Sequence, residues 1–319
     1  MSKALTHAKP SVQKLVDTFL AGRNANTREA YRLDLTDLKD FLGESSIQSS
    51  INKLLHAGQA GANLIVLDYR NALVEKGLQG NTINRRLSSI RAALKLARML
   101  GLIVWGIEVP NLKAELSRDT RGVGTSGIDA ILGELRRRKH PKATRDIAII
   151  RLFYDLGLRV SELVGLDLSD VDLKAGEIRI LGKGRTKKER LTIPEPTIRA
   201  LKRWLAVRPE GTSQAVFTNF DRAKKGDGRI TRFGVYKVIR WLGEQVNLKV
   251  RPHGIRHDAL TSAVRLAQEH GIELPSVLKF SRHKDLATLM VYLDLLQNRQ
   301  GEIATLVAGS LGKRKRKAL

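Results

Sequence analysis

The sequence contains no cysteine, and this absence removes several classes of protein at once. Disulfides, zinc sites with thiolate ligands, iron–sulfur clusters and cysteine nucleophiles are all excluded. Long apolar runs are absent too, because no stretch approaches the length of about 18 apolar residues that crosses a bilayer. The first ten residues are polar and lack the apolar core of a secretion signal. We therefore expect a cytoplasmic protein that makes no contact with a membrane.

A phosphate-binding loop of the form G-x-x-x-x-G-K-[ST] is also missing. Gly122, Gly124 and Gly127 have the spacing G-x-G-x-x-G of dinucleotide-binding folds, but that motif needs a strand before it and the preceding residues are polar. We interpret these glycines as part of a linker. Neither ATP nor NAD is expected, and no other cofactor or small-molecule substrate is indicated.

Positive charge, in contrast, is present in large excess. Lys and Arg number 57 against 32 Asp and Glu, which gives a formal net charge of +25. Most of the excess lies after residue 110, where 42 basic and 23 acidic residues are found. With 42% hydrophobic residues the chain can still fold around a core. This composition predicts a globular protein with a polyanionic partner, and nucleic acid is the first expectation.

Residues 1–108 predict a helical domain. Stripes of apolar residues at helical spacing predict helices over 27–42, over 64–76 and from Thr82 onward. The third helix also has a basic face, made of Arg85, Arg86, Arg91 and Lys95. An ordinary solvated face is one explanation for these side chains, but the overall charge favours contacts with DNA phosphates.

Residues 109–126 predict a linker between two domains, because a proline, two glycines and changes of charge interrupt the periodicity there. Residues 127–311 predict a second domain, and 312–319 a basic tail. Two strands joined by a basic glycine turn are expected over 177–181 and 190–193. Helices are expected over 128–138, 144–156, 195–206, 232–245, 256–270, 274–280, 286–296 and 302–309. The predicted fold class is therefore mainly α with a small β-hairpin or sheet.

Four segments of the second domain place polar residues of catalytic type in apolar surroundings. They are Gly157-Leu-Arg159-Val-Ser-Glu162-Leu163, Gly182-Lys183-Gly184, His253-Gly-Ile-Arg256-His257, and Ser281-Arg282-His283 with Tyr292 following. Each segment alone has an ordinary structural explanation. Besides these, the hairpin turn carries Arg185, Lys187 and Lys188, which together with Arg282 we predict to contact DNA.

In this order and spacing the four segments resemble the tyrosine recombinase (phage integrase) family in its compact Xer-like layout. The resemblance covers nearly the whole chain, and it implies a helical core-binding domain followed by a mixed α+β catalytic domain. It also implies the catalytic residues Arg159, Lys183, His253, Arg256, His283 and Tyr292. Two positions depart from the family pattern: Arg282 stands where glycine is usual, and the hairpin turn after Lys183 is longer.

The residue types suit cleavage of a phosphodiester without a metal ion. Negative charge grows on the non-bridging oxygens in the transition state, and two guanidiniums can bind those oxygens with bidentate geometry. We assign this role to Arg159 and Arg256. Glu162, one turn after Arg159, is expected to orient the basic side chains.

Tyr292 would attack phosphorus, and its phenol needs a base because the pKa of a free tyrosine is about 10. We choose His253 as that base. The 5′ oxygen must leave as a hydroxyl, and Lys183 on the hairpin is the expected acid. His257 and His283 are expected to hydrogen-bond the phosphate or to support the tyrosine.

A zinc site is the alternative explanation for one pair. His253 and His257 have the i, i+4 spacing of a metalloprotease motif, but that motif requires glutamate where Gly254 stands. No metal is expected.

The resemblance implies a site-specific recombinase that cleaves DNA through a 3′-phosphotyrosyl link and exchanges strands through a Holliday junction. The implied partners are double-stranded DNA with inverted-repeat core sites and three further copies of the chain, a homotetramer on two DNA sites. Two alternatives stay open: a catalytically silent DNA-binding or architectural factor, and an enzyme like type IB topoisomerases. A nucleoid-associated location follows from the DNA partner. After Tyr292, an apolar stripe of Ile303, Leu306, Val307 and Leu311 predicts a helix that packs on its own domain or on a neighbouring protomer.

Overall fold

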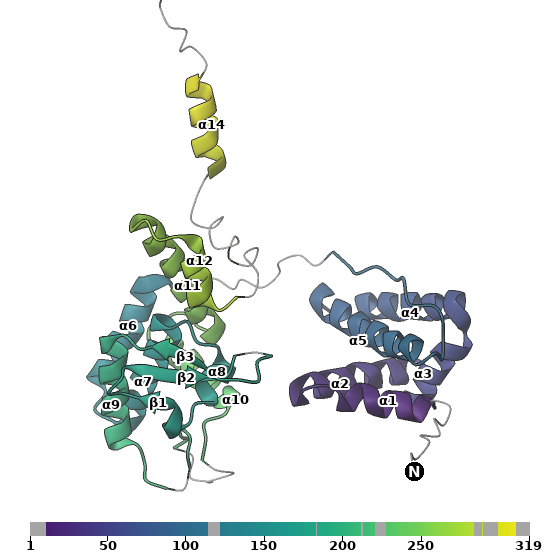
Figure 1. Ribbon diagram of the computed structural model, residues 1–319, viewed down its shortest axis with the longest axis horizontal. Helices are drawn as coiled ribbons and strands as arrows, with labels where there is room; N and C mark the ends of the chain where they lie inside the picture. Colours follow the sequence, from purple (N-terminus) through teal and green to yellow (C-terminus); the bar gives the residue numbers. More distant parts are fainter. Residues whose placement is uncertain are drawn as a thin grey trace, which may run out of the picture. The chain divides into compact units, whose positions relative to one another are not determined.

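The computed structural model describes residues 11–113, 122–182, 184–211, 213–220, 228–283, 289 and 299–310. The chain forms two compact units, Met1–Asp119 and Thr120–Leu319 (Figure 1). The fold is mainly helical with one small sheet, so the predicted fold class is confirmed. Of the helices in the described part of the chain, none combines the length and apolar character needed to cross a membrane.

Five helices build the described part of the first unit. They are α1 (Val12–Ala21), α2 (Ala25–Phe41), α3 (Ile47–His56), α4 (Gly58–Glu75) and α5 (Gly80–Met99). The sequence predicts only three of them, since α1 and α3 are short and bury three residues each. Their starts are nevertheless marked in the sequence. Ser11 caps α1, and Ser46 and Ser49 form a reciprocal capping box at α3.

The start of α2 corrects one detail of the prediction. Asn24 is its N-cap, and the Asn24 Oδ1 accepts a hydrogen bond of 3.0 Å from the Thr27 backbone nitrogen. Thr27, the first residue of the predicted helix, therefore lies inside α2. Both residue types cap helices well, so the sequence alone does not separate them.

Residues 109–113, predicted to open the linker, lie against α5. Val109 is buried, and its carbonyl accepts a hydrogen bond of 2.6 Å from Arg91. Asn84 exchanges two hydrogen bonds of 2.9 Å with the backbone of Leu112. These residues therefore continue the first unit, and the last part of the predicted linker is helical from Gly124 onward.

The second unit contains the sheet and most of the helices. Its elements are α6 (Gly124–Arg137), α7 (Pro141–Asp155), α8 (Val160–Val164), the 3-10 helix η1 (Leu168–Asp170), β1 (Val171–Asp172), β2 (Glu177–Ile180), β3 (Glu189–Thr192), α9 (Glu195–Val207), α10 (Arg232–Gln245), α11 (Pro252–Glu269), α12 (Leu274–Ser281) and α14 (Arg299–Ser310). The helix predicted over 286–296 lies outside the described residues, apart from Leu289, which is buried in a helical position.

The sheet is antiparallel in the order β1-β2-β3. Strands β2 and β3 form the predicted hairpin, with Ile178 paired with Leu191. The third strand, β1, has two residues and is too short to be predicted from alternation. Ile178 and Ile180 are buried on the face of the sheet that meets the core, and the hairpin turn leaves from the end of β2.

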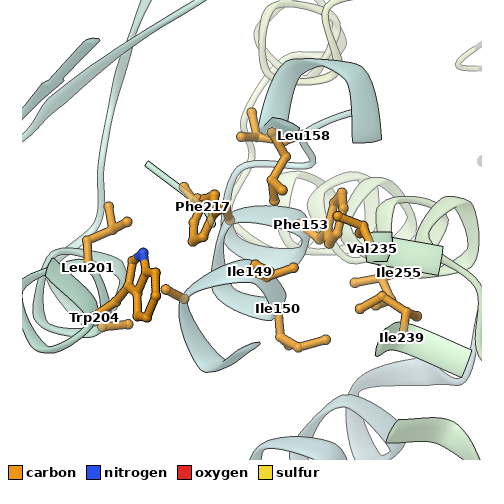
Figure 2. Packing of buried hydrophobic residues seen from close by; sticks show 14 of the residues in the cluster. Ile149, Ile150, Phe153, Leu158, Leu201, Trp204, Phe217, Val235, Ile239 and Ile255 are labelled. Atoms are coloured by element: carbon orange, nitrogen blue, oxygen red, sulfur yellow. The ribbon is translucent and has the colours of Figure 1, made fainter. Parts of the chain in front are cut away.

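Helix α7 forms the centre of the second core. Ile149, Ile150 and Phe153 are fully buried and point to different sides of the helix, as Figure 2 shows. Trp204 of α9 packs near Phe217, and its Nε1 donates to the Val216 carbonyl at 2.8 Å. Because neighbours surround α7, its C-terminal end is a rigid base for the residues that follow it.

Candidate active site

Arg159 is fixed at the start of α8 by Glu162. Helix α7 ends at Asp155, and Gly157 then turns the chain with a φ of +55°, a conformation that favours glycine. The backbone nitrogen of Arg159 donates to Glu162 Oε2 and its Nη1 donates to Oε1, both at 2.8 Å. The Glu162 side chain is fully buried, whereas that of Arg159 is 27% exposed. The guanidinium is thus held in place and remains accessible.

Arg256 lies in the first turns of α11 and joins three segments of the chain. The side chain is buried, and its Nη1 donates to the Gly157 carbonyl. Its Nη2 donates to the Ser281 carbonyl at 2.6 Å and lies 3.4 Å from His283 Nε2. Gly157 precedes Arg159 by two residues, so the two arginines predicted to act together meet at one turn. Figure 1 shows α8, α11 and α12 in the same unit.

Two histidines face these guanidiniums. His253 is exposed in the first turn of α11, and its pKa is lowered by partial burial and by the charges of Arg256 and Arg159. Burial lowers the pKa of His283 most, and the charges of Arg256, Arg159, Arg282 and His253 add to this effect in that order, so that together they bring it to about 4. At neutral pH both rings are therefore unprotonated. A neutral imidazole can accept a proton, as a general base must.

Arg282 does not have the position expected for a DNA contact. It ends α12 in the left-handed conformation, and its side chain is 5% exposed. Its Nη1 donates to the carbonyls of Leu156 and Phe280, both at 3.0 Å, and its Nη2 donates to Gly157 at 2.7 Å and to Glu162 at 3.2 Å. The prediction that Arg282 contacts DNA is therefore wrong, because the side chain is nearly buried and its Nη1 and Nη2 donate inside the protein.

The described basic residues of the hairpin turn are exposed, and one of them pairs with a buried carboxylate. Arg185 and Lys187 are exposed. Lys188 is exposed as well, and it forms an ion pair of 2.5 Å with Asp170, a buried carboxylate. Lys183, predicted to be the general acid, lies outside the described residues.

Two predicted site residues remain, Tyr292 and His257. Tyr292, the predicted nucleophile, lies outside the described residues. His257 is buried on α11, and its Nδ1 lies 3.5 Å from Thr261 Oγ1 on the next turn of the same helix. Across the described residues, no three His, Asp or Glu side chains are grouped as metal ligands.

The basic face predicted on α5 takes part in the packing of the first unit. Arg85 forms an ion pair of 2.5 Å with Asp34, which is buried, and Arg86 pairs with Asp37. Arg91 donates to the chain after α5, as described above, while Lys95 is exposed. A contact of these four residues with DNA stays a prediction.

Gly122 and Asp258 were not predicted, although they connect α6 to the helix that carries His253. Asp258 follows His257 on α11 and accepts a hydrogen bond of 2.8 Å from the Val123 backbone nitrogen. A Cβ on Gly122 would lie 1.9 Å from Asp258 Oδ2, so only glycine fits there. The contact spans 135 residues, and no local pattern in the sequence signals it.

The chain is similar to known proteins along most of its length. Residues 125–299 match the Phage integrase family, and residues 16–99 match the phage integrase N-terminal SAM-like domain. A tyrosine recombinase from Synechocystis sp. is 33% identical over 297 residues, which are 91% of this chain and 92% of that protein. Tyrosine recombinase XerC from Actinobacillus pleuropneumoniae serotype 7 is 34% identical over 282 residues, with coverage of 85% and 83%.

A similar fold is found in the XerH site-specific recombinase bound to a palindromic difH substrate, in a post-cleavage complex. The TM-score is 0.61 at 17% identity, and the likeness covers 97% of this chain and 100% of that one. The family match spans the unit in which Arg159, Arg256 and both histidines meet. This chain therefore belongs to the phage integrase family of tyrosine recombinases.

Proposed function

We propose that the protein is a site-specific DNA recombinase that cleaves one strand at a time through a 3′-phosphotyrosyl link. The observation that carries the proposal is the meeting of Arg159 and Arg256 at the Gly157 turn, beside two neutral histidines. Two fixed positive charges next to proton acceptors suit a reaction in which a phosphate gains negative charge while a hydroxyl loses its proton.

Both arginines would bind the scissile phosphate, but they differ in exposure. Arg159 is the more accessible guanidinium, and Glu162 already holds it in place, so little rearrangement is needed when charge develops. Arg256 is buried beside His283 and brings a second positive charge to the same turn. Both interactions would be strongest in the pentacovalent transition state.

Proton transfer is assigned to residues on either side of the arginines. Tyr292 is the proposed nucleophile, and His253, neutral at pH 7, accepts its proton. Lys183 on the hairpin donates a proton to the 5′ oxygen as it leaves. His283 hydrogen-bonds the phosphate from its place beside Arg256.

The proposed substrate is double-stranded DNA with inverted-repeat core sites, bound by four protomers on two sites. The net charge of +25 suits a DNA partner, and the XerH relative holds a palindromic DNA. Strand exchange through a Holliday junction would follow from cleavage of one strand per site, because each phosphotyrosyl bond conserves the energy for rejoining. We place this reaction at the nucleoid.

The test uses a duplex that carries a nick next to the cleavage point, built on a sequence that the full-length protein selects from random DNA. The nick releases a short fragment and traps the covalent adduct. Wild-type protein should form the adduct in EDTA, and Tyr292→Phe should bind the duplex but form none. An adduct in Tyr292→Phe, or a reaction that stops in EDTA and resumes with Mg²⁺, would contradict the proposal.

The same substrate separates the roles of the cations. Arg159→Ala and Arg256→Ala should each slow adduct formation by about 10²-fold or more. A 5′-phosphorothiolate leaving group needs little protonation, so it should restore Lys183→Ala but not Arg159→Ala. Lys187→Ala is the matched control in the exposed turn. If Lys187→Ala is the variant that is slow and restored, the acid lies at that position.

Two alternatives differ in their products. A silent DNA-binding factor would form no adduct with any nicked duplex. A topoisomerase-like enzyme would form the adduct, relax supercoiled plasmid as a monomer and give no recombinant between two sites.

A further inference from the structure

Arg282 has a backbone conformation that is unusual for a residue with a side chain. Its φ is 54° and its ψ is 33°, in the left-handed region, where it ends α12. A Cβ makes this region unfavourable, so glycine is the common residue at such a helix end. Among the described residues, Asn247 is the only other non-glycine residue with a positive φ. The unfavourable backbone conformation of Arg282 must therefore be offset by contacts that its side chain makes.

The guanidinium provides that compensation by binding the chain on both sides. Nη1 donates to the Phe280 carbonyl within α12 and to the Leu156 carbonyl after α7, and Nη2 donates to the Gly157 carbonyl beside it. The side chain therefore ties the end of α12 to the turn that precedes Arg159. This tie is made in a nearly buried position, where hydrogen bonds compete little with water.

The backbone held in this way supplies acceptors for both arginines of the site. Arg159 Nη2 lies 3.4 Å from the Arg282 carbonyl, and Arg256 Nη2 donates to the Ser281 carbonyl at 2.6 Å. His283, which meets Arg256, is the next residue in the chain. A change in the conformation of Arg282 would therefore move the partners of three residues of the site at once.

Arg282 also affects the charge of the site through Glu162. The buried carboxylate accepts hydrogen bonds from Arg159 and from Arg282. With both guanidiniums present the three groups together carry a net positive charge. Without Arg282, Glu162 would pair with Arg159 alone and cancel the charge that a phosphate needs.

We propose that Arg282 is a positioning residue of the cleavage site, which fixes the turn that holds Arg159, Arg256 and His283 and keeps Glu162 from neutralising Arg159. For its effect on cleavage this inference rests on the proposed function, whereas its effect on His283 does not. The experiment below therefore has one readout without DNA and one with DNA.

The readout without DNA is the titration of His283, followed by NMR in the full chain. The groups that face this ring are Arg256 and His253 of α11, Arg159 at the start of α8, and Arg282. Arg282→Gln and Arg282→Gly should raise the pKa of His283 from about 4 toward its ordinary value and change its chemical shift. Glycine suits the left-handed backbone, so Arg282→Gly keeps the test open if the glutamine variant folds poorly.

Arg145→Gln is the matched control. Arg145 is also 5% exposed and bound to a carboxylate and a carbonyl, but it lies in α7 with Asp146 and the Thr218 carbonyl as partners. It should lower stability without moving the titration of His283. An unchanged His283 titration in both Arg282 variants, or the same change in Arg145→Gln, would overturn the inference.

The readout with DNA is the rate of adduct formation on the nicked duplex. Arg282→Gln and Arg282→Gly should be slower by about 10-fold or more at unchanged DNA affinity. Arg282→Lys keeps the charge but loses the planar fork, and it should resemble the glutamine variant more than wild type. A wild-type rate in Arg282→Lys would overturn the positioning role. If even wild type forms no adduct, the proposed function fails, and the His283 titration still decides the inference.

Discussion

His283 and His253 couple the protonation of the site to folding. Burial and the surrounding guanidiniums lower the pKa of His283 to about 4, and they lower that of His253 as well. In the unfolded chain a histidine has a pKa of about 6.5, so the unfolded state binds these protons more readily. The stability contributed by the neutral rings is complete above that pH. It is lost as the pH falls toward the folded-state values.

We therefore expect the free energy of unfolding to fall between about pH 6.5 and pH 4, and to fall less steeply in His283→Gln. Glutamine keeps an oxygen that can accept a hydrogen bond from Arg256, but it does not titrate. Urea unfolding at a series of pH values measures this. His56→Gln is the control, because that residue belongs to the first unit and its Nδ1 lies 2.9 Å from the Asn52 carbonyl of its own helix. Equal pH dependence in wild type and His283→Gln would contradict the expectation.

At this scale the sequence predicts the types of residue and not their partners. Arg159 and Arg256 belong to sequence motifs that predict contacts with a phosphate. The structure brings both side chains to the turn at Gly157. Arg282 is one of 57 basic residues, and nothing near it in the sequence shows that it donates to Leu156, 126 positions earlier. Such long-range contacts are set by packing.

Among the elements, α6 and α11 are joined by the contact between Gly122 and Asp258. The carboxylate lies where a Cβ of residue 122 would be and binds the Val123 nitrogen just before α6 begins. Because α11 also carries His253 and Arg256, this contact fixes the helix that bears them.

Gly122→Ala should lower the free energy of unfolding by about 1–3 kcal/mol, because the new methyl group displaces the Asp258 carboxylate from the Val123 nitrogen. Gly133→Ala is the control, since a Cβ there meets nothing within 4 Å. Within α6 that change should be neutral or stabilise by up to about 1 kcal/mol. Urea unfolding of the two variants measures both effects. A Gly122→Ala protein as stable as Gly133→Ala would mean that Asp258 does not hold α6.

Long elements are predicted well and short ones less well, and the start of α11 differs from the prediction. The stripes of α2, α5 and α7 locate those helices, whereas α1 and α3 bury too few residues to be recognised. Helix α11 begins at Pro252, four residues before its predicted start, because Pro252 occupies the first turn, where its missing N–H is not needed. His253 thus belongs to the helix and not to the loop before it.

At the scale of the whole molecule, the notable feature is α14, which presents an apolar face to solvent. Ile303, Leu306 and Val307 are 57%, 74% and 59% exposed, which is much for large apolar side chains at helical spacing. Leu311, the fourth residue of the predicted stripe, lies outside the described residues. We propose that a second copy of the chain covers this face on DNA, consistent with the proposed tetramer.

Truncation after Arg299 should leave binding to a half-site nearly unchanged but weaken cooperative filling of the second half-site. Leu306→Asp should have the same effect, while Ala308→Asp, on the opposite face of α14, should not. Gel-shift titration with half and full sites measures the cooperativity. Unchanged cooperativity in both the truncated protein and Leu306→Asp would show that the helix packs on its own domain.

The cores of the two units have no described residue in common: one is built on α1 to α5, the other around α7. Tyr69, for example, is buried in a cluster that is made of residues of the first unit. Inherited changes can therefore accumulate in each half under separate constraints. The first unit can therefore change in sequence while the second keeps its two arginines and the turn that holds them, so that related proteins can differ in one half and share the site of the other.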